Sequence, residues 1–324
     1  MDHVKRWLTG KIINDTQPNR FMAIVVLSGG TGSIKLVRAL YRLKRDISIV
    51  CNVGDNIWLH GLYICPDIDT VVYGLAGILD SRGWGVKNDT FNCLDQLSLL
   101  GEERWFMLGD KDIALHIVRS KLMREGKSLS EVTDYICRRL GIDTQTRIIP
   151  VSDEHMETRI LTPQGRMHLQ EFWVKHRGML DVKGIEYVGN ARASSKALDA
   201  IMRSSKIIIP PANPVSSIGS VLAIQGIRDA LRSKRDSCIA ISPIVGDEVV
   251  SGPAGKYMLA LGYEPNVYFL SLMYRDFISS LVIDVKDIKY KESIEGLGIR
   301  VHIKDIMLDD ASALELARYL IEEV

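Results

Sequence analysis

Short apolar runs and segments of helical periodicity alternate along much of the chain. Apolar runs typical of buried strands occur at residues 22–27, 207–209 and 238–241, and residues 47–50 predict a further strand. Residues 34–41 place their apolar side chains on one helix face. Strands buried on both sides appear as unbroken apolar runs, and their alternation with helices is typical of a covered parallel sheet. The pattern predicts an α/β fold, with a Rossmann-like, mostly parallel sheet and helices on both faces.

The middle of the chain follows a different pattern. Residues 112–124 and 128–140 each have helical periodicity, and the second segment begins with the capping box Ser128-Leu-Ser-Glu131. Residues 158–162 and 167–172 flank a Pro-Gln-Gly turn, which predicts a β-hairpin. These elements predict an inserted helical and hairpin subdomain.

The change of pattern divides the chain into three parts. We expect residues 21–84 and 191–324 to form the Rossmann-like, nucleotide-binding core, and residues 85–190 to form the inserted subdomain. Residues 1–20 are predicted to be an N-terminal extension. They lack the apolar stretch of a signal peptide, and the chain has no run of 18 apolar residues for a membrane span.

Charge and cysteine usage narrow the class of protein. Lys and Arg number 41 against 40 acidic residues, a formal net charge of +1, which gives no electrostatic reason to expect nucleic acid or a membrane as partner. The five cysteines are odd in number and form no C-x-x-C motif, which disfavours a disulfide framework and a structural zinc site. We therefore expect a cytoplasmic protein.

A glycine-rich loop follows the first predicted strand, at Leu27-Ser-Gly-Gly-Thr-Gly-Ser-Ile-Lys35. Glycines let backbone N–H groups approach an anion, and the following helix adds its N-terminal dipole, so a diphosphate suits this loop. The spacing fits neither a Walker loop nor the dinucleotide fingerprint, which needs a glycine where Lys35 stands. The alternative is a tight strand-to-helix turn that binds nothing.

Carboxylates gather in other loops that follow strands, where open α/β sheets bind ligands. Asp55 follows the second predicted strand, and Asp67 and Asp69 open the next helix. Carboxylate oxygens beside a diphosphate are natural ligands for Mg²⁺, so all three aspartates are candidate metal ligands. The alternative for Asp67 and Asp69 is that they only cap the helix N-terminus.

The ordered set of motifs resembles the 2-phospho-L-lactate transferase family of deazaflavin coenzyme F-420 biosynthesis. The resemblance covers about residues 22–310. Its motifs are SGGTG at 28–32, NVGDN at 52–56, PDIDT at 66–70, RGWGVKNDTF at 82–91, LGDKDIALHIVRS at 108–120, PVSDEHMET at 150–158, ANPVSSIG at 212–219, and SPIVG and SGPAGK within 242–256.

The resemblance implies a Mg²⁺-dependent transferase that acts as a homodimer. The 2-phospholactyl group, or its enolpyruvyl phosphate analogue, would pass from lactyl-2-diphospho-5′-guanosine, or the enolpyruvyl donor, to the ribityl hydroxyl of 7,8-didemethyl-8-hydroxy-5-deazariboflavin. GMP would leave and coenzyme F-420-0 would form. Positioning and charge neutralisation carry most of such a transfer.

The resemblance and the chemistry of the side chains assign roles to individual residues. Asp55 and Asp69 are the catalytic candidates, as metal ligands or general base. The predicted donor-binding residues are Ser28, Gly29, Gly30, Thr31, Gly32, Asn213, Ser216, Ser217 and Gly219. The predicted deazaflavin-binding residues are Asp69, Trp84, Asn88, Asp89, Met107, His116 and Arg119. For Trp84 and His116 the alternative is a purely structural place in the core.

Two functions of other classes compete with the transferase. A non-enzymatic nucleotide or nucleotide-sugar binding regulator is possible in principle, because a related family is similar in the glycine loop and the second-strand loop. The RGWGVKNDTF and HIVRS stretches favour the deazaflavin-using branch. A nicotinamide oxidoreductase is disfavoured by the glycine spacing.

Overall fold

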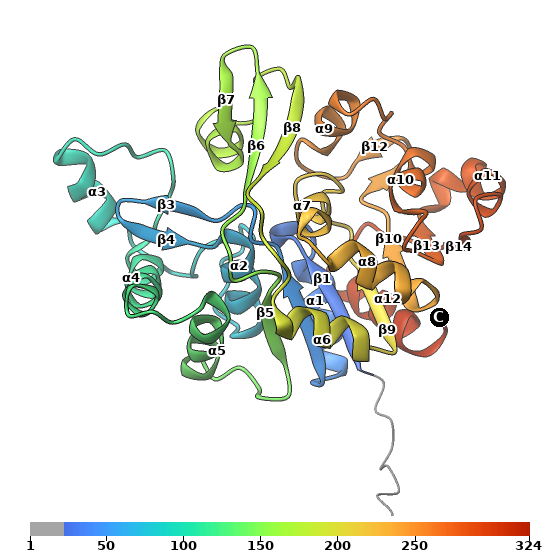
Figure 1. The fold of residues 1–324 in the computed structure, drawn as a ribbon, viewed down its shortest axis with the longest axis horizontal. Helices are drawn as coiled ribbons and strands as arrows, with labels where there is room; N and C mark the ends of the chain where they lie inside the picture. Colours follow the sequence, from blue (N-terminus) through green and yellow to red (C-terminus); the bar gives the residue numbers. More distant parts are fainter. Residues whose placement is uncertain (1–22) are drawn as a thin grey trace, which may run out of the picture.

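A seven-stranded parallel sheet forms the centre of the computed structural model, which describes residues 23–324 (Figure 1). Its order is β14-β13-β10-β9-β1-β2-β5, and every neighbouring pair is parallel. The strands are β1 Ile24–Ser28, β2 Ile47–Cys51, β5 Arg147–Pro150, β9 Lys206–Ile209, β10 Cys238–Ile241, β13 Ser280–Ile283 and β14 Arg300–Ile303. This confirms the predicted α/β fold with its Rossmann-like sheet.

The chain changes direction across the sheet between β1 and β9. From β1 it moves outward to β2 and β5, and it then returns to β9 and moves outward on the other side through β10, β13 and β14. In open α/β sheets, ligands bind outside the carboxyl ends of the strands at such a switch point. The loops that follow β1 and β9 are therefore the expected walls of a binding site.

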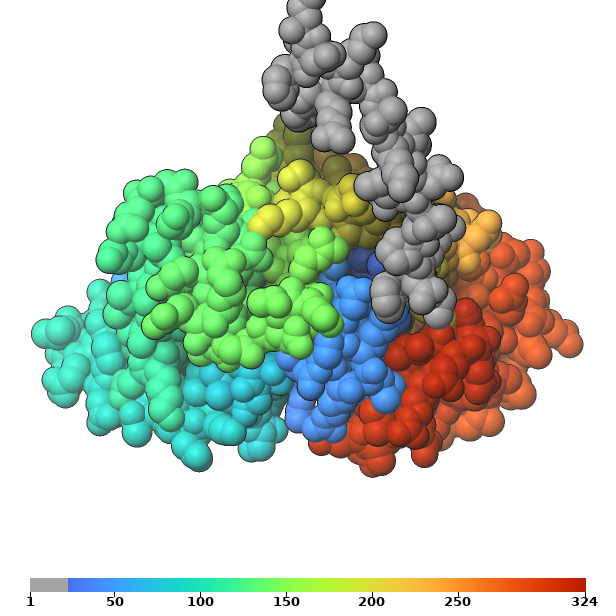
Figure 2. All heavy atoms as spheres, turned by 90° about the horizontal axis from the view of Figure 1, so that it is seen from below, coloured from blue at the N-terminus to red at the C-terminus, as the bar shows by residue number. Residues whose placement is uncertain are grey.

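Helices cover both faces of the sheet. On one face α1 packs against α2 and α12, and on the other α6 packs against α8. Figure 1 shows α6 and α8 in front of the strands, and Figure 2 shows α1 in blue beside α12 in red. The helices are α1 Ile34–Leu43, α2 Pro66–Leu75, α6 Ser195–Arg203, α8 Ile227–Ser233 and α12 Asp310–Glu322. Right-handed crossovers that run in opposite directions from β1 place their helices on opposite faces.

The middle of the chain adds helices and two small antiparallel sheets. Its helices are α3 Asn92–Leu99, α4 Asp110–Arg124 and α5 Leu129–Arg139. The predicted capping box is present at α5, where Ser128 Oγ accepts from the Glu131 N–H at 3.2 Å and Glu131 Oε2 accepts from the Ser128 N–H at 2.8 Å. The small sheets are β3 Ile57–Leu59 with β4 Leu62–Ile64, and β7 Gly165–His168, β6 Glu157–Thr162 and β8 Gly184–Val188 in the order β7-β6-β8.

Two predicted boundaries in the middle of the chain need correction. The hairpin forms, but its second strand ends at His168 instead of residue 172, because a π-helical turn at Glu171–Lys175 follows. Strand β5 lies within the predicted insertion 85–190, yet it pairs with β2 at the edge of the central sheet. A four-residue strand is too short to stand out by periodicity. The predicted extension, residues 1–20, lies outside the described residues.

Two expectations about the chain as a whole concern membranes and thiols. Within residues 23–324, no helix has the length and apolar character that a membrane span requires. The five cysteines are free thiols, and Cys51, Cys65 and Cys238 are buried. The absence of a disulfide framework is thus confirmed.

Candidate active site

A buried asparagine joins two buried carboxylates beyond the carboxyl end of β2. Asn52 Nδ2 donates to Asp55 Oδ1 at 2.8 Å and to Asp67 Oδ2 at 2.9 Å. Asn52 Oδ1 accepts from the Gly54 N–H at 2.9 Å and from the Ser220 hydroxyl at 2.8 Å. Both amide protons and the amide oxygen are therefore engaged, which fixes the orientation of the side chain. We call Asp55 and Asp67 the carboxylate pair, and Asn52 its bridging amide.

Three separate elements deliver these groups. Asp55 lies in the loop after β2, Asp67 lies in the first turn of α2, and Ser220 lies in α7 Ile218–Ala223. All of them are less than a tenth exposed. The geometry thus depends on the packing of both halves of the sheet, since α7 follows β9 and α2 follows β2.

The carboxylate pair is electrostatically unfavourable in its ionised form. Burial and the neighbouring Asp67 raise the pKa of Asp55 well above its ordinary value, and the Asn52 hydrogen bond opposes this shift. Burial, offset by Asn52 and reinforced by Asp69, raises the pKa of Asp67 to about 6. Across residues 23–324, no Lys, Arg or His side chain forms an ion pair with either carboxylate. Such a pair favours a proton or a cation between its members.

The carboxylate oxygens of Asp55 and Asp67 suit a hard divalent cation better than a transition metal. Mg²⁺ is commonly held by one or two carboxylates together with substrate phosphates and water, and it needs no sulfur or nitrogen ligand. No group of three or more His, Cys, Asp or Glu side chains arranged to hold a metal ion occurs in the described part of the chain. Asp55 and Asp67 therefore fit a Mg²⁺ site that a bound phosphate completes, while the predicted three-aspartate site does not form.

Asp69 points away from this pair and binds Arg119 of α4. The Arg119 guanidinium donates to both Asp69 carboxylate oxygens, to Oδ2 at 3.0 Å and to Oδ1 at shorter range. The Cys65 N–H also donates to Asp69 Oδ2, at 3.3 Å. Because both oxygens are engaged in a buried ion pair, the prediction of Asp69 as a metal ligand or free base needs correction. Its observed partner is Arg119.

A chain of buried polar groups continues from Arg119. Arg119 Nη1 lies 3.1 Å from His116 Nδ1, and His116 Nε2 lies 3.5 Å from Asp112 Oδ1, which also accepts from the Tyr73 hydroxyl. Burial lowers the pKa of His116 to about 4 and raises the pKa of Asp112 to about 7. His116 and Arg119 are 1% exposed, so they lie beneath the surface and are not placed for the predicted direct contact with deazaflavin.

The glycine loop packs directly on the carboxylate pair. Gly30 has φ +61°, and Asp67 Oδ1 occupies the space that a Cβ atom at residue 30 would need. The hydroxyls of Ser28 and Ser33 are 2.7 Å apart, and Ser33 Oγ donates to the Gly30 carbonyl at 2.8 Å. Two features therefore require glycine at residue 30: the left-handed backbone conformation and the close approach of the Asp67 carboxylate. The predicted donor loop and the predicted metal site lie together.

The loop after β9 closes the other side of the switch point. Asn213 Oδ1 accepts from the N–H groups of Val215 and Ser216, both at 3.0 Å, which shapes the turn. A Cβ atom on Gly29 would overlap the Ser217 side chain. Ser217 and the glycine loop are thus in contact, as the sequence prediction of a shared donor site requires.

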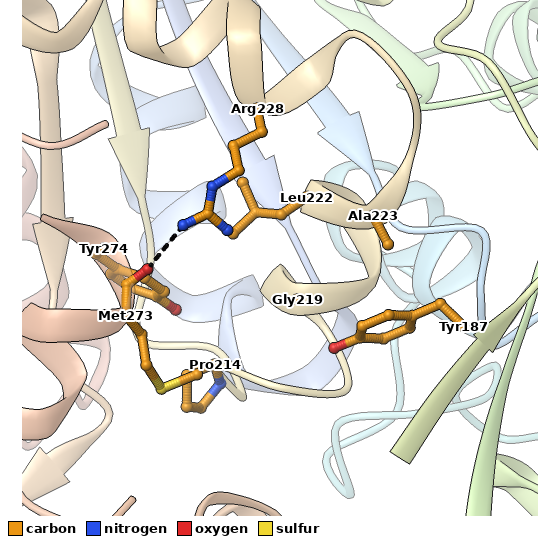
Figure 3. Close-up of a pocket in the computed structure, with 8 residues that line it drawn as sticks. All are labelled: Tyr187, Pro214, Gly219, Leu222, Ala223, Arg228, Met273 and Tyr274. Atoms are coloured by element: carbon orange, nitrogen blue, oxygen red, sulfur yellow. Dashed lines mark hydrogen bonds between the residues drawn. The ribbon is translucent and has the colours of Figure 1, made fainter. Parts of the chain in front are cut away.

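A cavity of about 200 Å³ lies on the far side of this loop (Figure 3). Gly219 and Pro214 form one wall, and Met273 and Tyr274 of α10 Val267–Tyr274 lie opposite Tyr187. The Tyr187 hydroxyl donates to the Val215 carbonyl at 2.7 Å, and Arg228 Nη2 donates to the Met273 carbonyl at 3.3 Å. Mostly apolar walls with a few polar groups are typical of a site for a flat organic ring.

A narrow slot beside α4 collects several of the predicted deazaflavin contacts. It is lined by Arg82, Trp84, Gly85, Val86, Asp89, Phe91, Met107, Gly109 and Asp112. Asp89 also caps α4, accepting from the N–H groups of Lys111 at 2.9 Å and Asp112 at 3.2 Å. Asn88 does not line the slot; it has φ +53° and its carbonyl accepts from Lys111 Nζ at 2.6 Å. Trp84, Asp89 and Met107 therefore remain candidates, whereas Asn88 has a structural place.

Sequence reasoning did not single out three residues of this region. Asn52, Tyr73 and Asp112 are central to the hydrogen-bond networks, although Asn52 and Asp112 stand in quoted motifs. A spacing of four residues links Tyr73 to Asp69 and Asp112 to His116, and residues four apart share a helix face. That spacing was the available signal for the buried network.

Comparison with known proteins gives one consistent result. A family model described as "2-phospho-L-lactate transferase CofD" matches residues 24–307. A 2-phospho-L-lactate transferase of Methanopyrus kandleri is 41% identical over 310 residues, which cover 94% of this chain and 98% of that protein. A phosphoenolpyruvate transferase of Streptomyces griseus is 37% identical over 313 residues, covering 93% and 98%.

A solved structure supports the fold. A member of the upf0052 family from Bacillus halodurans superposes with a TM-score of 0.63, covering 93% of this chain and 98% of that one. Its identity to this chain is 14%, so the similarity concerns architecture alone.

Proposed function

Since the chain belongs to the 2-phospho-L-lactate transferase (CofD) family, a family of phosphotransferases in coenzyme F-420 biosynthesis, we propose a specific reaction for it. The 2-phospholactyl group, or its enolpyruvyl analogue, passes from a diphosphoguanosine donor to the terminal ribityl hydroxyl of the deazaflavin precursor, and GMP leaves. The observation that carries this proposal is the carboxylate pair pressed against the glycine loop at the switch point of the sheet.

The proposed transfer assigns separate roles to Asp55 and Asp67. The ribityl oxygen attacks the phosphorus that bears the lactyl group, the bond from that phosphorus to the GMP oxygen breaks, and the hydroxyl proton must be accepted. Asp55 is our candidate acceptor, because Asn52 holds its buried carboxylate beside Asp67, which contacts the glycine loop. Mg²⁺ held by Asp55 and Asp67 would neutralise the diphosphate charge.

The donor and acceptor would approach from two directions. The glycine loop and the loop after β9, which touch at Gly29 and Ser217, flank the place that we propose for the diphosphate, and the cavity beside Gly219 is our candidate place for the base of the nucleotide. Trp84 in the slot beside α4 offers its ring face to the deazaflavin. The relatives' names include both lactyl and enolpyruvyl donors, so the choice of donor is left to experiment.

The direct test is incubation of the protein with the deazaflavin precursor, Mg²⁺ and each donor in turn. We expect GMP release and a product whose mass equals the acceptor plus the transferred phosphoester group. Tight nucleotide binding without product from either donor would instead support the non-enzymatic regulator.

Turnover is expected to require a hard divalent cation. Mg²⁺ or Mn²⁺ should support the reaction, because both suit carboxylate and phosphate oxygens. Excess chelator should abolish GMP release, and added Mg²⁺ should restore it. Full turnover in chelator would remove the cation from the proposal.

The same cation should stabilise the fold in a pH-dependent manner. Asp67 has a raised folded pKa of about 6, so the native state holds a proton that the unfolded chain has already released above about pH 4. The metal-free protein should therefore lose stability as the pH rises from about 4 to about 6. Melting curves at pH 5 and pH 7.5 should show a larger Mg²⁺-induced rise at pH 7.5. An equal rise at both values would argue against metal at Asp67.

Valine at Gly30 should weaken binding of the nucleotide donor by at least about tenfold. The branched side chain would strain the left-handed backbone and displace the Asp67 carboxylate. Isothermal titration with GDP and Mg²⁺ measures the effect. Gly141→Val is the matched control, because Gly141 has φ +72° and open space around its missing Cβ. If both variants bind GDP like the unchanged protein, the loop does not cradle the diphosphate.

A further inference from the structure

Beside the proposed cation, an arginine or lysine side chain could bind the remaining negative charge of a diphosphate donor. Two lysines near these motifs are already engaged elsewhere. Lys35 Nζ donates to the Leu308 carbonyl at 2.5 Å, and Lys256 Nζ donates to the Gly178 carbonyl at 2.8 Å. Asp69 binds the buried Arg119. Arg82 is a partly exposed arginine next to the residue that Thr31 of the glycine loop contacts.

The segment that carries Arg82 lies over the glycine loop. Thr31 Oγ1 donates to the Gly83 carbonyl at 3.4 Å. A Cβ atom on Gly83 would be 3.0 Å from Thr31 Cγ2, so the Thr31 side chain packs closely against the Gly83 backbone. The Arg82 backbone is therefore adjacent to the proposed diphosphate site.

The Arg82 side chain lines the slot beside Trp84. Its guanidinium carbon lies 4.2 Å from the centroid of the Trp84 ring, and its Nε donates to Asp80 Oδ1 at 2.7 Å. The side chain is 43% exposed. A cation over an exposed aromatic ring is held by about 0.5–1 kcal/mol, which a competing ring can replace.

The slot has no room for a ligand in this arrangement. It is too narrow to admit even a water molecule. An aromatic acceptor that stacks on the slot side of Trp84 must therefore displace a lining group. Arg82 is the exposed, flexible member, whereas Asp89 and Asp112 are fixed by the helix cap and the buried network.

We propose that Arg82 couples the two substrate sites: the acceptor ring displaces its guanidinium from Trp84, and the guanidinium then binds the diphosphate at the glycine loop. This inference rests on the proposed function. Guanidinium groups bind phosphate oxygens in a two-pronged geometry, so the released side chain gains strong hydrogen bonds. By linkage, each ligand must then tighten the binding of the other.

The test measures GDP affinity with and without saturating deazaflavin precursor, by calorimetry in Mg²⁺. GDP carries no transferable lactyl group, so the ternary complex cannot react. The acceptor should tighten GDP binding at least about fivefold in the unchanged protein, within the usual range of coupling between sites. Arg82→Gln should reduce this factor to below about twofold, and Arg82→Lys should restore only part of it.

Arg124→Gln is the matched control. Arg124, the last residue of α4, also lies over a tryptophan, 5.7 Å from the ring centroid of Trp58 in β3, and it donates to the Gly61 carbonyl of the β3–β4 hairpin. It should keep the full coupling. Absence of coupling in the unchanged protein, or its persistence in a folded Arg82→Gln variant, would overturn the inference while product formation still supports the transferase. A protein that binds neither ligand would overturn both.

Discussion

Replacing Asp67 by asparagine should lower turnover by at least about a hundredfold, and should leave the metal-free protein as stable as before or more stable at neutral pH. The loss of activity follows from removing half of the proposed cation site. The gain in stability follows from removing one of two buried like charges whose mutual repulsion raises the pKa of Asp55. Asparagine can still accept the hydrogen bond that Asn52 donates at this position.

GMP release and melting temperature, measured on one protein preparation, test this prediction. Asp46→Asn is the matched control, because Asp46 is an exposed acid at the opposite end of β2. The control should change neither quantity. Undiminished turnover in Asp67→Asn would exclude the carboxylate from the reaction, and a large fall in melting temperature would show that the pair is structural.

Replacing Asp69 by asparagine should have the opposite effect on stability, lowering the free energy of unfolding by about 3–5 kcal/mol. The substitution leaves the Arg119 guanidinium charged, 1% exposed and without its carboxylate. A helix-capping role alone predicts almost no cost, because asparagine caps as well as aspartate. Turnover should also fall, since the first turn of α2 carries Asp67 as well.

Denaturant unfolding of Asp69→Asn and of the double variant Asp69→Asn, Arg119→Met separates these explanations. The double variant also removes the unpaired Arg119 charge, and this should recover most of the lost stability. Apolar side chains of similar volume often replace a buried ion pair without net cost. A loss below about 1 kcal/mol in the single variant would favour the capping role. Two aspartates only two residues apart are thus expected to differ in the sign of their effect.

Local patterns were sufficient for much of the fold and for the loops that meet at the candidate site. Strands β1, β2, β9 and β10 were predictable because each is a short, mainly apolar run next to a helical pattern. The loops after β1, β2 and β9 were predictable parts of the candidate site, because they follow strands whose carboxyl ends meet at the switch point. Strand β5 was not, since its sheet pairing depends on β2, about a hundred residues earlier.

A local sequence pattern could not predict that Asp67 and Asp69 have different partners. Residues 67 and 69 are two apart on a helix and therefore face different directions. Which direction leads to the glycine loop depends on α4, because Arg119 attracts Asp69 from fifty positions further along the chain. For the same reason, His116 and Arg119 looked like substrate contacts in the sequence but are buried by the packing of α4 against β4 and α5.

The switch point between β1 and β9 also sets the order in which the protein can acquire its activity during synthesis. The Ser220 hydroxyl holds Asn52 across a separation of 168 residues, and Ser217 closes the loop around Gly29 across a similar distance. Contacts so far apart in the chain require a large loop to close and form late in folding. A nascent chain that has emerged only as far as α6 has both acidic ligands but neither serine. We therefore expect the proposed nucleotide site to form only after the ribosome has exposed α7, when two thirds of the chain is already in place.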